Sequence, residues 1–271
     1  MGNRQLSARR RSALGVLAFL LAVSGCKSVR SVRVEPKPPL AIRTSQAEKM
    51  RQQGWALWAQ QPRNLARVTD AARMLEQAAR AIPDNYDAQC EAAAVLSFVS
   101  ENGTTADVRR NTAKSGIVLA RRAQQLKPNG AAGYYWYAIN IGLLADSDRS
   151  YGLKAVGEMK SALERAIEID ERIDYAGPLR TLGILYLRTP APPVSIGSSR
   201  KGLRLLQRAV LLFPDYPENY IYLAEALHAV GRNDEAHEAL QKVLDARPWP
   251  DRQFESGQWK ADAQKLLQKL K

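Results

Sequence analysis

A pattern of small and large residues recurs along the chain and restricts the folds that it can adopt. A small residue is followed four positions later by a large one, then three positions later by alanine, and five positions later by proline. Residues 71–83 and 202–214 carry the whole pattern, residues 116–128 have a small residue in the large position, and residues 159–171 lack the proline. At helical spacing these residues share one face, where small residues let two helices cross closely and large ones fill the holes between them. The chain is therefore predicted to be all-α and built from packed helix pairs.

Residues 217–248 come closest to a complete repeat of two helices. Gly231 supplies the turn between them, and Pro248 ends the second helix. The alanine-type positions of successive pairs lie 45, 43, 43 and 34 residues apart. Only the last spacing equals the period of about 34 of a helix–turn–helix repeat. We assign the excess to enlarged loops inside the earlier pairs, expected at residues 61–67, 101–109, 145–152 and 189–199.

These features predict an α-solenoid of about five helix pairs over residues 46–253. A solenoid exposes apolar surface at its last repeat, and that surface has to be covered. Residues 254–271 form one more amphipathic segment beyond the last pair. We interpret this segment as a C-terminal capping helix.

The N-terminus is typical of an export signal. Residues 1–11 are cationic, and residues 12–22 form an apolar run that is too short to span a bilayer. The sequence Val-Ser-Gly-Cys at residues 23–26 resembles a lipobox, in which a peptidase cuts before the cysteine and the thiol carries a diacylglycerol. We therefore expect residues 1–25 to be a signal peptide and Cys26 to be the lipidation site. An ordinary signal peptide with an unrelated cysteine is the alternative.

Residues 26–45 are predicted to be the lipidated cysteine and a flexible tether, because they contain three prolines and no helical period. Several acyl chains on one residue give stable membrane anchoring. In lipoproteins of this type, a lysine such as Lys27 directly after the cysteine implies sorting to the outer membrane. The expected location is therefore the cell envelope, at the outer membrane and facing the periplasm.

Charge and motifs exclude several classes of function. The net charge of +13 is concentrated in the first 43 residues, and the rest shows no basic stripe interleaved with aromatic residues. We therefore expect no nucleic-acid partner. The sequence contains no P-loop, dinucleotide fingerprint or nucleophile elbow, and its two histidines lack ligand spacing. We expect a protein that is not an enzyme, with no cofactor and no metal.

The mature chain resembles tetratricopeptide-repeat lipoproteins, through the lipobox and the match of residues 217–248 to the repeat consensus. More narrowly, it is similar to the T component associated with TRAP transporters. That similarity rests on the aromatic segment at residues 133–138 and the Pro/Gly/Ser segment at residues 192–197. It implies a periplasmic protein that works with a solute-binding subunit and has an apolar channel for a ligand.

In tetratricopeptide arrays the first helix of each pair lines a concave groove. The corresponding positions of this chain are mostly apolar, with Arg180 and Glu225 as the inner exceptions. Two interpretations remain open. The groove is a hydrophobic cavity for an apolar ligand or a partner segment, or it is filled by the protein's own loops or tether. The candidate groove residues are Trp55, Trp58, Tyr135, Ile139, Arg180, Ile184 and Glu225.

The leading functional hypothesis is a non-enzymatic periplasmic scaffold that binds a protein partner, such as a solute-binding protein or an envelope assembly complex. A transport accessory that carries an apolar solute is the first alternative. The second is an assembly lipoprotein of the outer membrane or of a secretion system.

Overall fold

The computed structural model describes residues 40–147 and 152–270 of the chain. This part forms eleven α-helices and contains no β-strand. The predicted signal peptide, the candidate lipidation site Cys26 and most of the predicted tether lie outside the described residues. The helices are α1 Leu40–Ala59, α2 Leu65–Ala81, α3 Tyr86–Asn102, α4 Ala106–Leu126, α5 Ala131–Ser147, α6 Gly152–Asp170, α7 Ile173–Arg188, α8 Ser199–Leu212, α9 Pro217–His228, α10 Asn233–Asp245 and α11 Gln253–Lys269.

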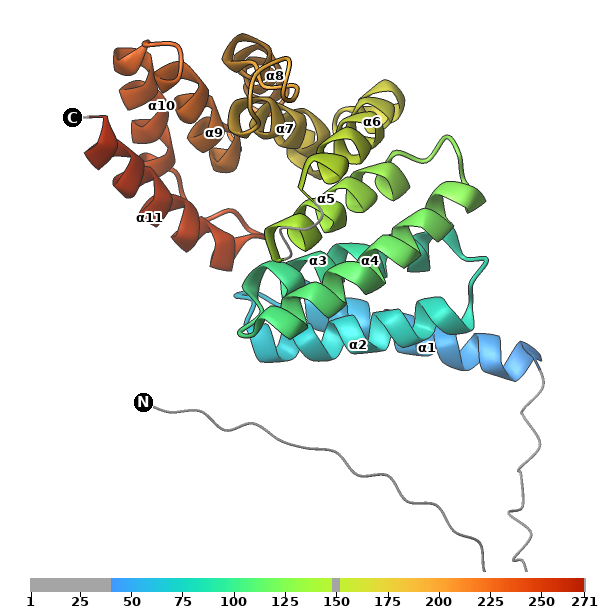
Figure 1. Ribbon diagram of the computed structural model, residues 1–271. Coiled ribbons are helices and arrows are strands. Elements are labelled where there is room, and N and C mark those ends of the chain that lie inside the picture. The colour runs from blue at the N-terminus through green and yellow to red at the C-terminus, as the bar shows by residue number, and fades with distance from the viewer. Residues whose placement is uncertain (1–39, 148–151, 271) are drawn as a thin grey trace, which may run out of the picture. The chain divides into compact units, whose positions relative to one another are not determined.

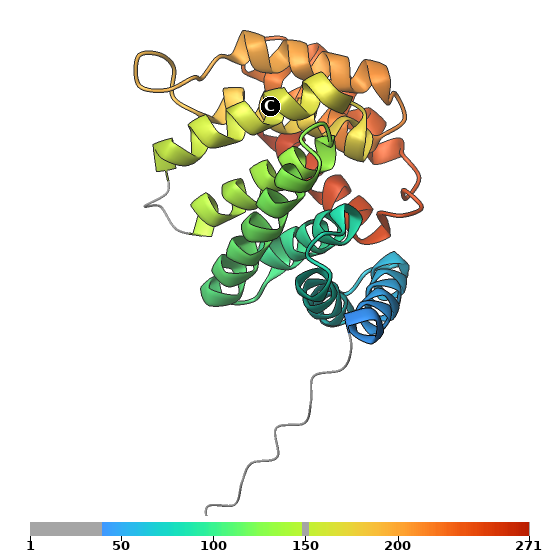
Figure 2. The ribbon, with the colours of Figure 1, turned by 90° about the vertical axis from the view of Figure 1, so that its right-hand side faces the viewer.

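The first ten helices pack as five consecutive pairs, from α1–α2 to α9–α10. Figure 1 and the turned view of Figure 2 show the pairs following one another in chain order. The large residues of the recurring pattern, Leu75 on α2, Leu163 on α6 and Leu206 on α8, are completely buried. The predicted all-α repeat fold is therefore confirmed, and it rests on the size pattern that predicted it.

Polar side chains at the helix starts set several of the helix boundaries. Asn64 accepts a hydrogen bond from the backbone N–H of Arg67 at the start of α2, and Thr105 does the same for Val108 at the start of α4. Ser198 caps α8 in the same way. A cap of this type satisfies one of the N–H groups that a helix leaves free at its N-terminus. The turns between helices are therefore encoded locally.

The connections of the first, second and fourth pairs lie at the expected segments 61–67, 101–109 and 189–199, but in the early repeats most of the extra residues lengthen the helices and not the loops. The segment 101–109 is mostly helical, because α3 continues to Asn102 and α4 begins at Ala106. Helix α1 begins at Leu40, inside the stretch assigned to the tether. The fourth pair does have a long connection, where Ser198 N–H bonds to the carbonyl of Tyr186. The longer helices α3 and α5 extend the groove surface of the second and third pairs and bring further side chains into the cavity described below.

The C-terminal segment crosses from the last pair back toward the first. Trp259 and Ala263 of α11 are buried, and α11 packs on α9 and α10. The start of α11 reaches α3, where the rings of Phe254 and Phe98 lie 5.7 Å apart, and Figure 1 shows this path. Helix α11 therefore covers the last repeat and also forms a wall beside the first helices of earlier pairs.

Close helix crossing in the fourth pair makes a testable prediction. A Cβ atom added at Gly202 would lie 2.8 Å from the carbonyl oxygen of Gly183, so even Gly202→Ala forces α7 and α8 apart. Overpacking of this kind costs about 1–3 kcal/mol. At Gly157 of α6 a Cβ meets nothing within 4 Å, and Gly157→Ala should stabilise the helix by about 0.5–1 kcal/mol. Urea unfolding followed by circular dichroism measures both, and equal effects would contradict the close crossing.

Candidate functional site

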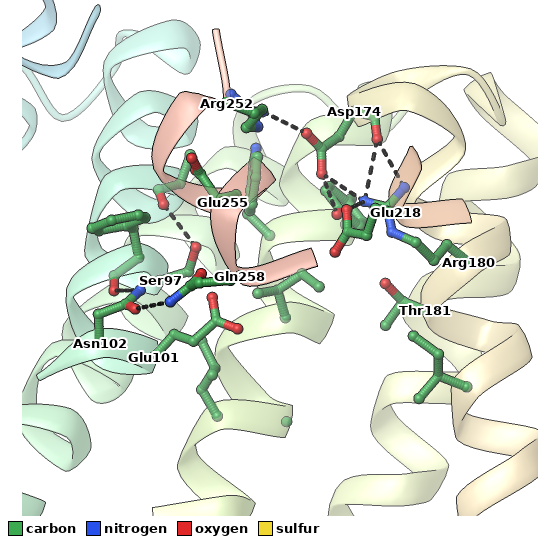
Figure 3. Close-up of a pocket in the computed structure, with 18 of the residues that line it drawn as sticks. Ser97, Glu101, Asn102, Asp174, Arg180, Thr181, Glu218, Arg252, Glu255 and Gln258 are labelled. Atoms are coloured by element: carbon green, nitrogen blue, oxygen red, sulfur yellow. Dashed lines mark hydrogen bonds and ion pairs between the residues drawn. The ribbon is translucent and has the colours of Figure 1, made fainter. Parts of the chain in front are cut away.

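A cavity of about 310 Å³ lies on the concave side of the repeats. Helices α3, α5, α7 and α9, each the first of its pair, line most of the cavity. The start of α11 with the segment before it, Trp58 of α1 and Met159 of α6 complete the lining. Figure 3 shows side chains from these elements converging on one space. Its polar lining includes Ser97, Glu101, Asn102, Asp146, Asp174, Arg180, Thr181, Glu218, Tyr222, Arg252, Glu255 and Gln258.

Five of the seven candidate groove residues line this cavity: Trp58, Tyr135, Ile139, Arg180 and Ile184. The other two lie elsewhere.

Trp55 is 42% exposed and lines a separate depression on the other side of Trp58. Glu225 is not part of the cavity lining and forms an ion pair with Arg188, in which the oxygen and nitrogen lie 3.1 Å apart. Cys26 lies outside the described residues. Periodicity along the first helices therefore brings most of the candidates together, and it fails at Trp55 of the first pair and Glu225 of the last.

The cavity wall combines charged and apolar side chains, whereas the sequence predicted a mostly apolar groove. Helix α3 is longer than a standard repeat helix, so the same face continues one turn beyond Ser97 to Glu101. Helix α5 continues in the same way from Gly142 to Asp146. One further groove position on each first helix, four residues beyond Ser97 and Gly142, would have identified Glu101 and Asp146. The charges of the C-terminal segment could not be found this way, because that segment belongs to no repeat.

One end of the cavity is built around a backbone turn of unusual conformation. Asp174, Tyr175 and Ala176 have φ angles of 50°, 55° and 67°, in the left-handed region. Such a conformation costs about 1–2 kcal/mol for each residue that is not glycine. Arg180 donates a hydrogen bond of 3.1 Å to the Tyr175 carbonyl, and Asn219 donates one of 3.2 Å to the same oxygen. These two side chains offset the strain by holding the turn in place.

The Asp174 carboxylate joins this turn to three other parts of the fold. It accepts a hydrogen bond of 2.6 Å from the Tyr135 hydroxyl of α5. The Arg252 guanidinium lies 2.9 Å from one Asp174 oxygen and the Arg180 guanidinium 3.3 Å from the other, as Figure 3 shows. Arg180 also lies 3.2 Å from Glu218. Charges of opposite sign are therefore matched at this end of the cavity.

Burial affects the two central charges of this network in different ways. Burial raises the pKa of Glu218, although the charge of Arg180 opposes the shift. Burial disfavours the Arg180 guanidinium, but attraction to the carboxylates of Glu218 and Asp174 keeps the pKa of Arg180 above its ordinary value. Arg180 is thus a permanent buried cation, and its role is to hold the left-handed turn and two acidic side chains together.

An aromatic cluster packs against the ring of Tyr175 in this turn. The rings of Tyr175 and Tyr216 stack with centroids 4.4 Å apart and an interplanar angle of 18°. Trp249 packs edge-on against both rings, and Trp259 of α11 packs edge-on against Tyr216. Edge-to-face and offset-stacked pairs of this kind are favoured beyond their area of contact. The cluster fixes the C-terminal segment against the fourth and fifth pairs, and so fixes one wall of the cavity.

Parts of the sequence match two known protein families. Residues 57–176 match the family described as regulator of microtubule dynamics protein 1-3, and residues 200–253 match the tetratricopeptide repeat. Neither match extends over half of the chain. No curated protein matches the sequence significantly.

Solved structures of other proteins share the fold. The tetratricopeptide protein TTC0263 of Thermus thermophilus superposes with a TM-score of 0.60 at 21% identity, over 80% of this chain and 98% of that chain. Pseudomonas aeruginosa pilF superposes with a TM-score of 0.54 at 15% identity, over 84% of this chain and 93% of that chain. At these identities the likeness concerns the fold alone. Together with the match of residues 200–253 and the five helix pairs, it shows that the chain has a helical repeat fold of the tetratricopeptide type.

Proposed function

We propose that the chain is a non-enzymatic scaffold of the cell envelope that binds a segment of a protein partner in its concave cavity. The observation that carries the proposal is the convergence of polar side chains from four repeats and from α11 on one cavity. Protein partners are what the tetratricopeptide fold typically binds, and first helices supply the groove. A lining of fixed charges gives such a site specificity for one kind of segment.

The polar lining also discriminates between the two hypotheses for the ligand. A carrier of an apolar solute needs walls without ionised groups, because a buried charge that loses water without gaining a partner is strongly unfavourable. This cavity has Glu101 and Asp146 in its walls, and neither carboxylate forms an ion pair with a described residue. The lining therefore supports recognition of a polar segment over transport of an apolar solute.

Anchoring at the outer membrane, on the periplasmic side, completes the proposal and rests on the lipobox and on Lys27. Among residues 40–147 and 152–270, no helix is both long and apolar enough to cross a membrane. The partner is proposed to be an envelope protein, either a solute-binding subunit or a component of an assembly complex.

A photo-reactive amino acid tests whether a protein enters the cavity. Placed at Thr181, which lines the cavity, it should form one discrete protein adduct in the native host. Placed at Leu211, which is 80% exposed on α8, it should not form that adduct. The same cells test the anchor, since Cys26→Ser should move the protein from the membrane fraction to the soluble fraction. Adducts that are equal at both positions, or that contain only a small molecule, would contradict the scaffold.

A further inference from the structure

The end of the cavity that lies away from Arg180 is acidic and carries the carboxylates of Glu101 and Asp146. Glu101 points from α3 into the cavity, near Gln258 and across from Thr181 (Figure 3). In the part of the chain that the structure describes, neither Glu101 nor Asp146 forms an ion pair, whereas Asp174 and Glu218 at the other end are paired. The two ends of one cavity therefore differ in their electrostatics.

Two further polar atoms in the same lining have no hydrogen-bond partner among the described residues, although the carboxylate that carries one of them is ion-paired with Arg63. The Oε2 atom of Glu255 is buried and has none among the described residues, although its Oε1 accepts from Arg63. The Tyr222 hydroxyl of α9 also forms no hydrogen bond with any described residue, and burial raises the pKa of that hydroxyl. Buried polar groups in native proteins almost always have a partner. These two groups have unused capacity to accept a hydrogen bond from a ligand.

Mutual repulsion makes this end of the cavity favourable for a positive charge. The Glu101 carboxylate is accessible to solvent inside the concavity, yet protein surrounds it on most sides. Burial and the charges of Glu218, Glu255 and Asp146 raise the pKa of Glu101 to about 7. A cation placed among these carboxylates would relieve the repulsion and return Glu101 to its ionised form. A metal ion is a poor match, since the described residues contain no group of three side chains arranged to hold one.

The remaining walls indicate what kind of cation fits. Ile139, Ile184 and Met159 provide apolar surface next to the carboxylates. A lysine or arginine side chain has a long apolar stem that packs on such surface and a charged head that needs acceptors. A volume of about 310 Å³ is near the lower limit of roughly 300–1,000 Å³ for ligand pockets, so it suits one long side chain and not a folded element.

We propose that Glu101, Asp146, Tyr222 and Glu255 bind the charged head of one lysine or arginine side chain that the partner segment inserts into the cavity. This inference rests on the proposed function, because it specifies which segment the scaffold recognises. The carboxylates accept hydrogen bonds from the ammonium or guanidinium group, and the Tyr222 hydroxyl oxygen provides an uncharged acceptor. The ion-paired end around Arg180 then serves as a rigid frame for this acceptor site.

Capped pentapeptides of the form acetyl-Ala-Ala-X-Ala-Ala-amide test the inference on the full-length chain in detergent. Binding is followed by the fluorescence of the tryptophans, since Trp58, Trp136 and Trp259 line the cavity. Peptides with X as lysine or arginine should bind at least tenfold more tightly at pH 8 than those with X as leucine or glutamate. Equal binding of the leucine peptide would overturn the inference.

A variant of Glu101 and the pH dependence of peptide binding test whether Glu101 accepts the charged head of the lysine side chain. Glu101→Gln should weaken lysine-peptide binding about tenfold at pH 8, whereas Asp107→Asn, at an exposed position of α4 outside the cavity, should leave it unchanged. Because the pKa of Glu101 is about 7 in the free protein, affinity should fall about tenfold from pH 8 to pH 6 as Glu101 takes up a proton. Glu101→Gln should abolish that dependence. Unchanged pH dependence in this variant would assign the titration to another group and overturn the role of Glu101.

Free cadaverine separates a partner side chain from a small amine. It should bind more weakly than the lysine peptide, because it lacks the backbone on either side of the side chain. Binding as tight as that of the peptide would overturn the partner-segment assignment. Failure of all peptides together with a protein adduct at Thr181 would refute this inference and leave the scaffold intact. Peptide binding without any adduct would refute the scaffold and leave the cation site.

Discussion

Replacing Arg180 with alanine is expected to lower the free energy of unfolding by about 3–5 kcal/mol, the usual cost of removing one partner from a buried ion pair. Arg180 is 5% exposed and lies 3.3 Å from Asp174 and 3.2 Å from Glu218. Its loss leaves two carboxylates in the cavity wall with less compensation. It also removes the hydrogen bond that holds the left-handed turn at Tyr175. Chemical denaturation followed by circular dichroism measures the change.

A second arginine of the same helix provides a matched control. Arg188 forms an ion pair with Glu225 at 3.1 Å, but its side chain is 59% exposed. Water screens such a pair and the long side chain loses entropy in forming it, so Arg188→Ala should cost no more than about 1 kcal/mol. Similar losses for Arg180→Ala and Arg188→Ala would show that the network around Asp174 does not hold the turn.

Tyr216→Ala is expected to cost a similar amount, about 3–5 kcal/mol, because it empties the centre of the aromatic cluster. Tyr216 is 1% exposed and its ring contacts Tyr175, Trp249 and Trp259. Without this ring the C-terminal segment loses its main apolar contact with the fourth and fifth pairs. Hydrogen exchange should therefore become faster in α11 before it becomes faster in α2 or α4.

The phenylalanine variant separates the ring from the hydroxyl. The Tyr216 hydroxyl forms only a long hydrogen bond of 3.3 Å to Glu218, so Tyr216→Phe should cost no more than about 1.5 kcal/mol. Exchange in α11 should stay as slow as in the parent protein. Uniformly faster exchange in all helices of Tyr216→Ala would contradict a local role for the cluster in holding α11.

Much of the fold could be predicted because its signals are local. The spacing of Leu75, Leu163 and Leu206 relative to the neighbouring small residues is enough to identify the packed helices. Capping residues such as Thr105 and Ser198 mark where helices begin. Loop lengths are harder to predict, since a spacing between repeats does not say whether extra residues lengthen a helix or a connection.

The candidate site was predictable only in part, for a related reason. Tyr135, Ile139, Arg180 and Ile184 follow from the groove register of the first helices. Glu101 would have followed had the helices been given their actual lengths. Of the three residues in the left-handed turn at 174–176, only Asp174 is of a type that adopts this backbone with some ease, so the sequence does not predict three such residues in a row. Its conformation depends on the neighbouring Arg180 and on Asn219 of α9, which is 44 residues away from Tyr175 in the sequence.

The sequence by itself determined the class of this protein: paired helices, a repeat of helix hairpins and a terminal helix, because residue size at helical spacing decides which faces can pack. Only the tertiary structure decided the chemistry of the cavity. Arg252 and Glu255 enter it because the C-terminal segment turns back across the concave side, and Asp174 enters it because long-range contacts stabilise a strained turn. Helix packing depends on near neighbours in the chain, whereas a cavity is assembled from residues that only folding brings together.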